Sequence, residues 1–143
     1  MSGSYDTTVS FWDNKSNSSH PIQTLKGFRD SVCRVQFKGS EVVCGSMDGS
    51  VRFYDIRNGQ FTSDEFSEPI QSMGVSYSNK VYIASCTDNR IYLVEKSSGN
   101  RIQEYSGHNV GTFKIDCAFN IRDSHIVSGS VDGKLYVYEI MKK

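Results

Sequence analysis

The segment Gly45-Ser-Met-Asp-Gly-Ser-Val-Arg-Phe-Tyr-Asp55 decides the fold, and residues 129–139 repeat its pattern as Gly-Ser-Val-Asp-Gly-Lys-Leu-Tyr-Val-Tyr-Glu. In both segments an aspartate in a tight-turn context is followed by apolar residues three and five positions later. A bulky residue and an acidic residue then stand six and seven positions after the aspartate. Alternation with a period of two, beginning directly after a turn, is typical of a strand that leaves a hairpin.

The pattern occurs four times at a regular spacing. The turn aspartates are Asp6, Asp48, Asp88 and Asp132, which lie 42, 40 and 44 residues apart. The apolar pairs that follow them are Val9/Phe11, Val51/Phe53, Ile91/Leu93 and Leu135/Val137. A period of about 40 to 45 residues is that of a four-stranded propeller blade. The sequence therefore predicts an all-β fold, a β-propeller with four strands in each repeat.

Local features add detail to this prediction. Apolar residues at 113, 115, 117 and 119 alternate with other residues and predict a strand over 113–119. The pairs Asp48-Gly49 and Asp132-Gly133 predict two-residue hairpin turns in which both central residues have positive φ.

The composition excludes several classes of protein. The chain has 16 basic and 16 acidic residues, so it lacks the net positive charge that favours a dedicated nucleic-acid binder. No apolar run approaches the roughly 20 residues that cross a bilayer, and the first residues do not resemble a signal peptide. The four cysteines form no CxxC pair, which favours buried thiols in a reducing compartment. We therefore expect a protein of the cytoplasm, the nucleus or both.

The sequence predicts no catalytic, cofactor-binding or metal-binding residues. Gly129–Lys134 differs from a phosphate-binding loop in its glycine spacing and in the residue after its lysine. No GxSxG nucleophile motif occurs, and aspartates that recur at the repeat period are expected to serve their own turns. A propeller hydrolase is the remote alternative. It would need acids or histidines that converge on the inner strands, where we expect apolar or small residues.

Gly107-His108 opens the last repeat, 24 residues before Asp132. With the acidic pairs, this segment resembles the WD-repeat family, also called WD40. The resemblance implies a hydrogen-bonded structural network within a blade, formed here by His108, Ser130, Asp132 and Tyr138, with the tyrosine in the usual place of tryptophan. Matching positions in the other repeats are Asp6, Trp12, Asp48 and Asp88.

Residues 45–60 and 122–134 are similar to the mitogen-activated protein kinase organizer subgroup of WD-repeat proteins. This similarity implies a seven-bladed scaffold that gathers components of a kinase cascade. Because related WD-repeat proteins also occur in spliceosomal assemblies, a role in pre-mRNA splicing is the alternative. In either case the partners are proteins.

The repeats divide the chain into a half blade (1–26), two blades (27–66 and 67–106) and a blade that lacks its last strand (107–143). This division predicts thirteen strands, two of them before residue 27, or about 3.5 blades of a seven-bladed propeller. We expect the chain to be a piece of a longer propeller that can self-associate through its open ends.

We expect the binding surface on the face of the propeller that carries the loop before each first strand and the hairpin after each second strand. Loops on a rigid scaffold commonly carry function. Residues expected to project there and bind partners are Tyr5, Phe28, Arg29, Met47, Thr87, Asn109 and Val131. Several are of types enriched at interface centres.

Overall fold

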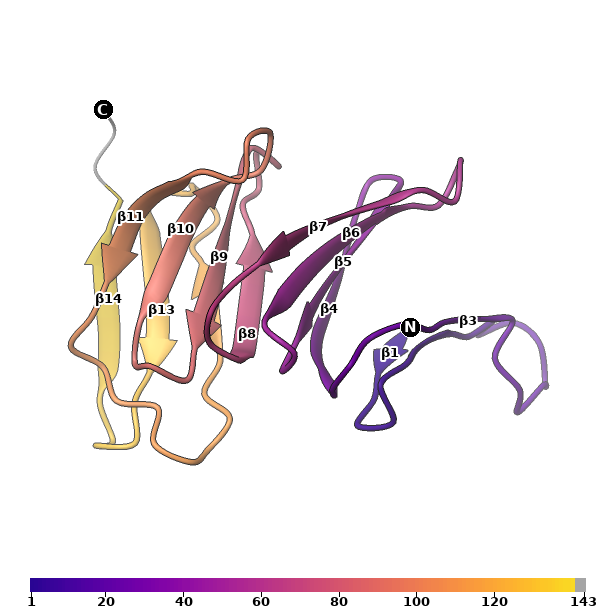
Figure 1. The fold of residues 1–143 in the computed structure, drawn as a ribbon, viewed down its shortest axis with the longest axis horizontal. Helices are drawn as coiled ribbons and strands as arrows, with labels where there is room; N and C mark the ends of the chain where they lie inside the picture. The colour runs from indigo at the N-terminus through magenta and orange to yellow at the C-terminus, as the bar shows by residue number, and fades with distance from the viewer. Residues whose placement is uncertain (141–143) are drawn as a thin grey trace.

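The structure is a computed structural model and describes residues 1–140, which form fourteen strands in four antiparallel sheets (Figure 1). The first sheet holds β1 (Ser2–Gly3), β2 (Val9–Phe11) and β3 (Gln23–Leu25). The second holds β4 (Val32–Lys38), β5 (Glu41–Ser46), β6 (Ser50–Asp55) and β7 (Phe61–Glu65). The third holds β8 (Ile70–Val75), β9 (Val81–Cys86), β10 (Ile91–Glu95) and β11 (Arg101–Tyr105). The fourth holds β12 (Cys117–Phe119), β13 (His125–Gly129) and β14 (Leu135–Glu139).

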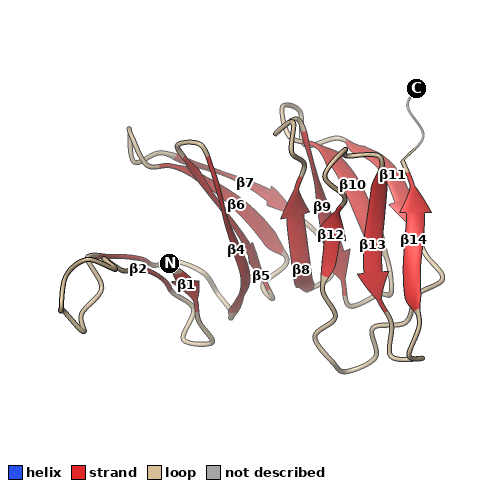
Figure 2. Ribbon diagram, turned by 180° about the vertical axis from the view of Figure 1, so that it is seen from behind, coloured by secondary structure: helices blue, strands red, loops and turns tan. Residues whose placement is uncertain are grey.

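Within every sheet the strands follow the order of the chain. The first strands of successive sheets contact one another: β1 lies against β4, β4 against β8 and β8 against β12. The sheets therefore stand as blades whose first strands lie next to one another, and Figure 2 shows β8 and β12 side by side. The predicted all-β propeller architecture is confirmed.

The predicted count of thirteen strands is wrong. The first sheet contains three strands, because Ser2 and Gly3 pair with Ser10 and Val9 as β1. A strand of two residues is too short to show a period of two in the sequence. The last predicted blade also includes residues 141–143, which lie outside the described residues.

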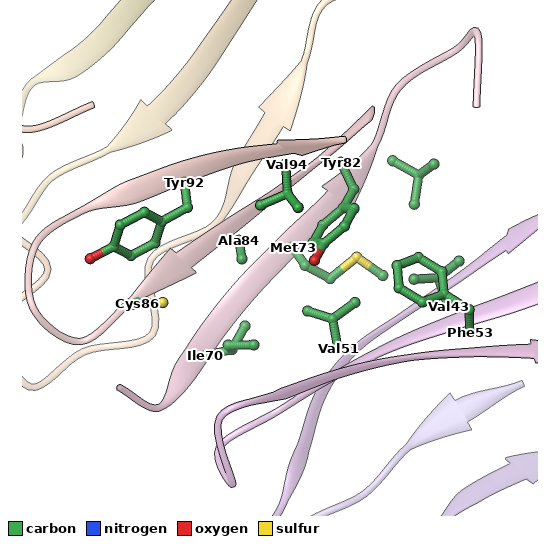
Figure 3. Packing of buried hydrophobic residues seen from close by; sticks show 11 residues of the cluster. Val43, Val51, Phe53, Ile70, Met73, Tyr82, Ala84, Cys86, Tyr92 and Val94 are labelled. Atoms are coloured by element: carbon green, nitrogen blue, oxygen red, sulfur yellow. The ribbon is translucent and has the colours of Figure 1, made fainter. Parts of the chain in front are cut away.

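Apolar side chains from both faces of the middle sheets form the core. On β5, Val43 packs toward the third sheet, whereas Val42 and Cys44 pack toward the first. A third cluster, which includes Ile83 and Ile126, fills the space between the third and fourth sheets. Figure 3 shows the middle cluster, in which residues of β5 and β6 meet residues of β8, β9 and β10. Burial on both faces explains why these strands read as nearly continuous apolar runs.

The fourth sheet differs from the middle sheets. On β14, Leu135 and Val137 are exposed while Tyr138 packs toward the third sheet. The strand predicted over 113–119 is also wrong in its first half, because β12 begins only at Cys117. A turn in which the Phe113 N–H donates to the Val110 carbonyl at 3.3 Å precedes it, and the positive φ of Gly111 (+55°) permits that turn.

The hairpin turns also differ from prediction. In each of them only the residue after the aspartate has positive φ, and the aspartate itself does not. These residues are Thr7 (+69°), Gly49 (+84°), Asn89 (+63°) and Gly133 (+78°). The Gly49 N–H donates to the Ser46 carbonyl at 3.2 Å, which matches a type I turn followed by a left-handed residue.

The turn aspartates all lie at one end of the sheets, together with the loops that precede the first strands. Figure 2 shows these connections below the strands, including the long one between β11 and β12. We call this end, formed by residues 4–8, 26–31, 46–50, 66–69, 86–90, 106–116 and 130–134, the hairpin end. Within residues 1–140 there is no helix that could cross a membrane.

Candidate protein-interaction face

Each turn aspartate closes its hairpin in the same way. Its Oδ1 accepts a hydrogen bond from the backbone N–H two residues further on. The donors are Thr8, Ser50, Arg90 and Lys134, at 3.1, 2.9, 3.1 and 3.1 Å. An aspartate side chain that bonds its own backbone two residues on stabilises a turn. The recurrence of aspartate in the sequence therefore has a direct structural cause.

In the second, third and fourth sheets, a side chain four residues after the aspartate binds its second carboxylate oxygen. The Tyr92 hydroxyl donates to Asp88 at 2.8 Å, and the Tyr136 hydroxyl donates to Asp132 at 2.9 Å. In the second sheet Arg52 takes this place, with its Nη2 atom 3.5 Å from Asp48. The sequence contains this signal at a fixed spacing, but the predicted network did not include these three residues.

Arg52 connects the hairpin of the second sheet to the loop before β4. Its Nη1 donates to the Gly27 carbonyl at 2.9 Å, and its guanidinium lies 4.3 Å from the centre of the Phe28 ring. The side chains of Arg52 and Asp48 are only 11% and 2% exposed. Burial opposes ionisation of Asp48, but hydrogen bonds from Ser50 and the Arg29 N–H hold its pKa below the ordinary value.

In the structure, the four residues of the predicted network around His108 make separate hydrogen bonds and do not form one connected group. The His108 Nδ1 atom and the Tyr138 hydroxyl lie 2.9 Å apart, with the histidine almost fully buried. Asp132 instead bonds Tyr136, and Ser130 bonds the backbone of Asn109. Burial lowers the pKa of His108, against the opposing effect of the Asp88 charge. His108 and Tyr138 thus hold the loop before β12, while Asp132 holds the β13–β14 turn.

The first sheet departs further from the implied network. Trp12 is partly exposed, and its indole N–H donates to the Ser2 hydroxyl at 3.0 Å. Asp6 bonds both the backbone and the hydroxyl of Thr8. The structure therefore does not bring Trp12 and Asp6 together in one hydrogen-bonded group.

Backbone hydrogen bonds fasten the hairpins to the loops that precede the first strands. The Met47 N–H donates to Ser31 at 2.9 Å, and the Val131 N–H donates to Asn109 at 2.8 Å. The third sheet repeats the bond from Thr87 to Pro69, at 3.1 Å. These bonds and the aspartate contacts give the loops of the hairpin end a defined geometry.

Six of the seven predicted partner-binding residues reach the surface at least in part. Tyr5 is 90% exposed, Arg29, Asn109 and Val131 are exposed, and Met47 and Thr87 are half-buried. Phe28 is only 6% exposed, because it packs against Tyr54 beneath the Arg52 guanidinium. Its prediction as a surface contact is corrected accordingly.

Tyr5 and Met47 come together at a pocket of about 350 Å³. The remaining lining residues come from the start of β4, from β8 and from the loop before β12, and are Ser31, Val32, Cys33, Gln71, Thr112, Phe113 and Lys114. The sequence did not indicate Gln71, Phe113 and Lys114 as candidate site residues. The repeat pattern carries no signal for them, because the pocket forms where loops of different sheets meet.

The inner strands are more polar than predicted. Arg34, Gln36 and Lys38 of β4 line a second pocket of about 210 Å³, so the expectation of apolar or small inner positions is wrong for this strand. Arg34 lies 3.4 Å from Asp116. The Ser72 hydroxyl donates to Asp116 at 3.1 Å and accepts the Cys117 N–H. These contacts join β8 to the segment that enters β12.

The thiols of Cys44, Cys86 and Cys117 are buried, and that of Cys33 is partly buried. Burial raises the pKa of Cys33 to about 11 and those of Cys44, Cys86 and Cys117 to about 12. A thiol with such a pKa stays protonated at neutral pH and is a poor nucleophile. Residues 1–140 contain no cluster of three or more His, Cys, Asp or Glu side chains that could hold a metal ion.

Comparison with known proteins supports the repeat assignment. The family described as "WD domain, G-beta repeat" matches residues 19–55 and 99–139. The chain is 38% identical over 128 residues to WD repeat domain-containing protein 83 of Rattus norvegicus, covering 90% of this chain and 41% of that protein. Its Dictyostelium discoideum homolog is 31% identical, covering 99% of this chain and 52% of that protein. The chain thus spans about two fifths to one half of the length of these relatives.

A solved structure shows the same fold. The WD40 domain of Toxoplasma gondii coronin matches 94% of this chain and 39% of its own, with a TM-score of 0.77 and 18% sequence identity.

Proposed function

Because the chain belongs to the WD40 repeat family, we propose that it is a non-catalytic scaffold whose hairpin end binds other proteins. The observation that carries the proposal is the pocket beside Tyr5 and Met47, set among loops that hydrogen bonds hold in place. Preorganised loops lose less conformational freedom on binding, which favours affinity. Tyrosine and methionine are also enriched at interface centres.

The double substitution Met47→Ala with Arg29→Ala tests this proposal. Both residues reach the surface, and Arg29 makes an exposed ion pair of 3.3 Å with Glu65 whose loss costs little stability. We expect the tagged variant to retain fewer proteins than the wild type in quantitative affinity purification from cells. The matched control is Lys80→Ala, an exposed residue in the β8–β9 loop at the opposite end of the sheets. Equal recovery from all three proteins contradicts the proposal.

For the pathway, we propose a scaffold of a mitogen-activated protein kinase cascade. The support is the similarity of residues 45–60 and 122–134 to that subgroup. The alternative is a component of a pre-mRNA splicing complex. The same purification distinguishes them, since kinases of one cascade support the first role and spliceosomal proteins the second.

We propose a cytoplasmic or nuclear location, which imaging of the tagged protein tests directly. An exclusively secreted protein contradicts it. A hydrolase remains the remote alternative, and turnover by the purified protein in a hydrolase substrate panel would support that alternative.

We further propose that the four sheets, divided at residues 1–26, 27–66, 67–106 and 107–143, are blades of a seven-bladed propeller. Self-association through open sheet faces stays a prediction of the sequence, and the exposed Leu135 and Val137 on β14 support it. Light scattering tests it, because a purely monomeric chain at high concentration contradicts self-association.

A further inference from the structure

The pocket beside Tyr5 and Met47 contains a buried amide without a full set of partners. Gln71 lines the pocket from β8 and is only 6% exposed. Its Oε1 atom is buried and accepts no hydrogen bond from the described residues. A buried acceptor left unpaired costs about 1 to 3 kcal/mol, so a ligand N–H gains by bonding this oxygen once the amide turns toward the pocket.

The primary amide of Gln71 carries both an acceptor and a donor, which are the complement of a peptide group. A backbone N–H and C=O in an extended segment can pair with both. Small apolar molecules lack this pairing, and it therefore favours a polypeptide as the occupant. Gln71 differs in this respect from the four turn aspartates, whose carboxylates all accept hydrogen bonds from donors within the protein.

The walls of the pocket favour a large apolar side chain. Phe113 is 68% exposed, Tyr5 is more exposed still, and Met47 and Val32 complete an apolar lining. A volume of about 350 Å³ is enough for one such side chain with part of its backbone, but not for a folded domain. Large aromatic residues and methionine at such a position are typical of a contact that carries much of the binding energy.

Lys114 determines the expected charge of the ligand. Its ammonium donates to the Cys33 carbonyl at 2.6 Å, and no salt bridge joins it to a carboxylate among the described residues. Lys114 is exposed at the pocket, where it attracts an acidic residue and repels a basic one.

Resting on the proposed function, we infer that this pocket binds an extended acidic peptide segment of a partner protein, which inserts one large apolar side chain. The inserted residue packs among Tyr5, Met47 and Phe113. Its backbone pairs with Gln71, and a neighbouring carboxylate pairs with Lys114.

A phage-displayed library of random heptapeptides, selected on the immobilised full chain, tests the inference. We expect enrichment of peptides with a large apolar residue next to Asp or Glu. Selection on the Lys114→Glu variant is expected to lose the acidic residues and to favour Lys or Arg instead. The matched control Lys80→Glu, with the same charge change in the β8–β9 loop, is expected to keep the wild-type preference.

Synthetic peptides from the selection then measure the contribution of the amide. We expect Gln71→Leu to weaken their binding about tenfold, because one hydrogen bond to a buried group is worth about 1.4 kcal/mol. Thermal melting of each variant shows whether it is folded. If Gln71→Leu does not fold, Lys114→Glu, an exposed substitution, still decides the inference.

Enrichment of basic peptides by the wild type, or a preference unchanged by Lys114→Glu, overturns the inference. Its failure is distinguishable from failure of the proposed function. If no acidic apolar peptide is enriched while Met47→Ala with Arg29→Ala still loses cellular partners, the scaffold function stands and this ligand class is wrong.

Discussion

The hairpins of the second and fourth sheets have nearly the same sequence around their aspartates, but their carboxylates are held by different chemistry. Asp48 is buried and faces the guanidinium of Arg52, whereas Asp132 is partly exposed and faces the hydroxyl of Tyr136. Both use their other oxygen for the backbone N–H two residues on. The turn therefore requires the aspartate, while its side-chain partner depends on how deeply the hairpin is buried.

The loops before the two sheets differ correspondingly. Where the fourth sheet has Gly107-His108, the second has Gly27-Phe28. His108 bonds Tyr138, whereas Phe28 cannot make such a bond and instead lies beneath Arg52. Arg52 thus binds both the turn and the preceding loop of the second sheet. In the fourth sheet, separate residues hold the turn and the loop.

The largest expected effect is that of Arg52→Met. This substitution leaves Asp48 buried beside no cation, and loss of one partner of a buried ion pair costs about 3 kcal/mol. The fourth-sheet counterpart Tyr136→Phe removes a bond at an exposed carboxylate, so we expect a much smaller loss. Urea unfolding gives both free energies of unfolding. Arg52→Tyr, which copies Tyr92, should lose less than Arg52→Met. Equal losses for Arg52→Met and Tyr136→Phe would mean that burial does not distinguish the two hairpins.

A smaller difference is expected for the glycines that follow the two aspartates. A Cβ at Gly49 would lie 2.7 Å from the Phe66 carbonyl oxygen, whereas one at Gly133 meets nothing within 4 Å. Both have positive φ, so Gly133→Ala should cost about 1 kcal/mol from backbone strain alone. Gly49→Ala adds a clash with backbone and should cost at least about 2 kcal/mol. Thermal or urea unfolding of the two variants measures the difference, and the reverse order would contradict the close approach of the Phe66 carbonyl to Gly49.

The smallest expected effect is a pH dependence confined to the fourth sheet. The pKa of His108 is lowered by burial, so the unfolded chain binds the proton more readily than the folded one. Stability from this group is complete above about pH 6.5, the ordinary histidine value, and is lost as the pH falls below it. We expect the melting temperature to fall between about pH 7.5 and 5.5.

Because carboxylates also titrate toward low pH, the variant His108→Phe provides the control. It copies Phe28 of the second sheet and should show a smaller fall over the same range. Hydrogen exchange should locate the acid-sensitive opening in β12–β14 and not in β4–β7. An identical pH dependence in the wild type and the variant would rule out this role for His108.

The fold was largely predictable from the sequence because the turn aspartates recur with the blade period. Each aspartate makes the same hydrogen bond to its own nearby backbone, so the pattern can be recognised without knowing the rest of the structure. The apolar residues that alternate around these aspartates likewise indicate burial from the local sequence alone. By contrast, β1 consists of two residues, and the segment before Cys117 alternates without forming a strand. Tertiary context decides both cases.

The candidate site was predictable only in part. Tyr5 and Met47 were found because they precede turn aspartates, a position that the repeat fixes. Gln71 and Lys114 were not predicted, because the pocket depends on how β4, β8 and the loop before β12 meet. Phe28 was wrongly predicted to be exposed. Its ring is buried beneath Arg52, a residue 24 positions away that no local sequence pattern connects to it.

The binding role of the hairpin end can be tested most directly by photo-crosslinking in cells. The photoreactive residue p-benzoylphenylalanine would replace Met47 in one variant, Phe113 in a second, and Lys80 at the opposite end in a third. We predict crosslinks to other proteins from positions 47 and 113 and few from position 80. Crosslinks that arise mainly from position 80, with none from 47 or 113, would contradict the account.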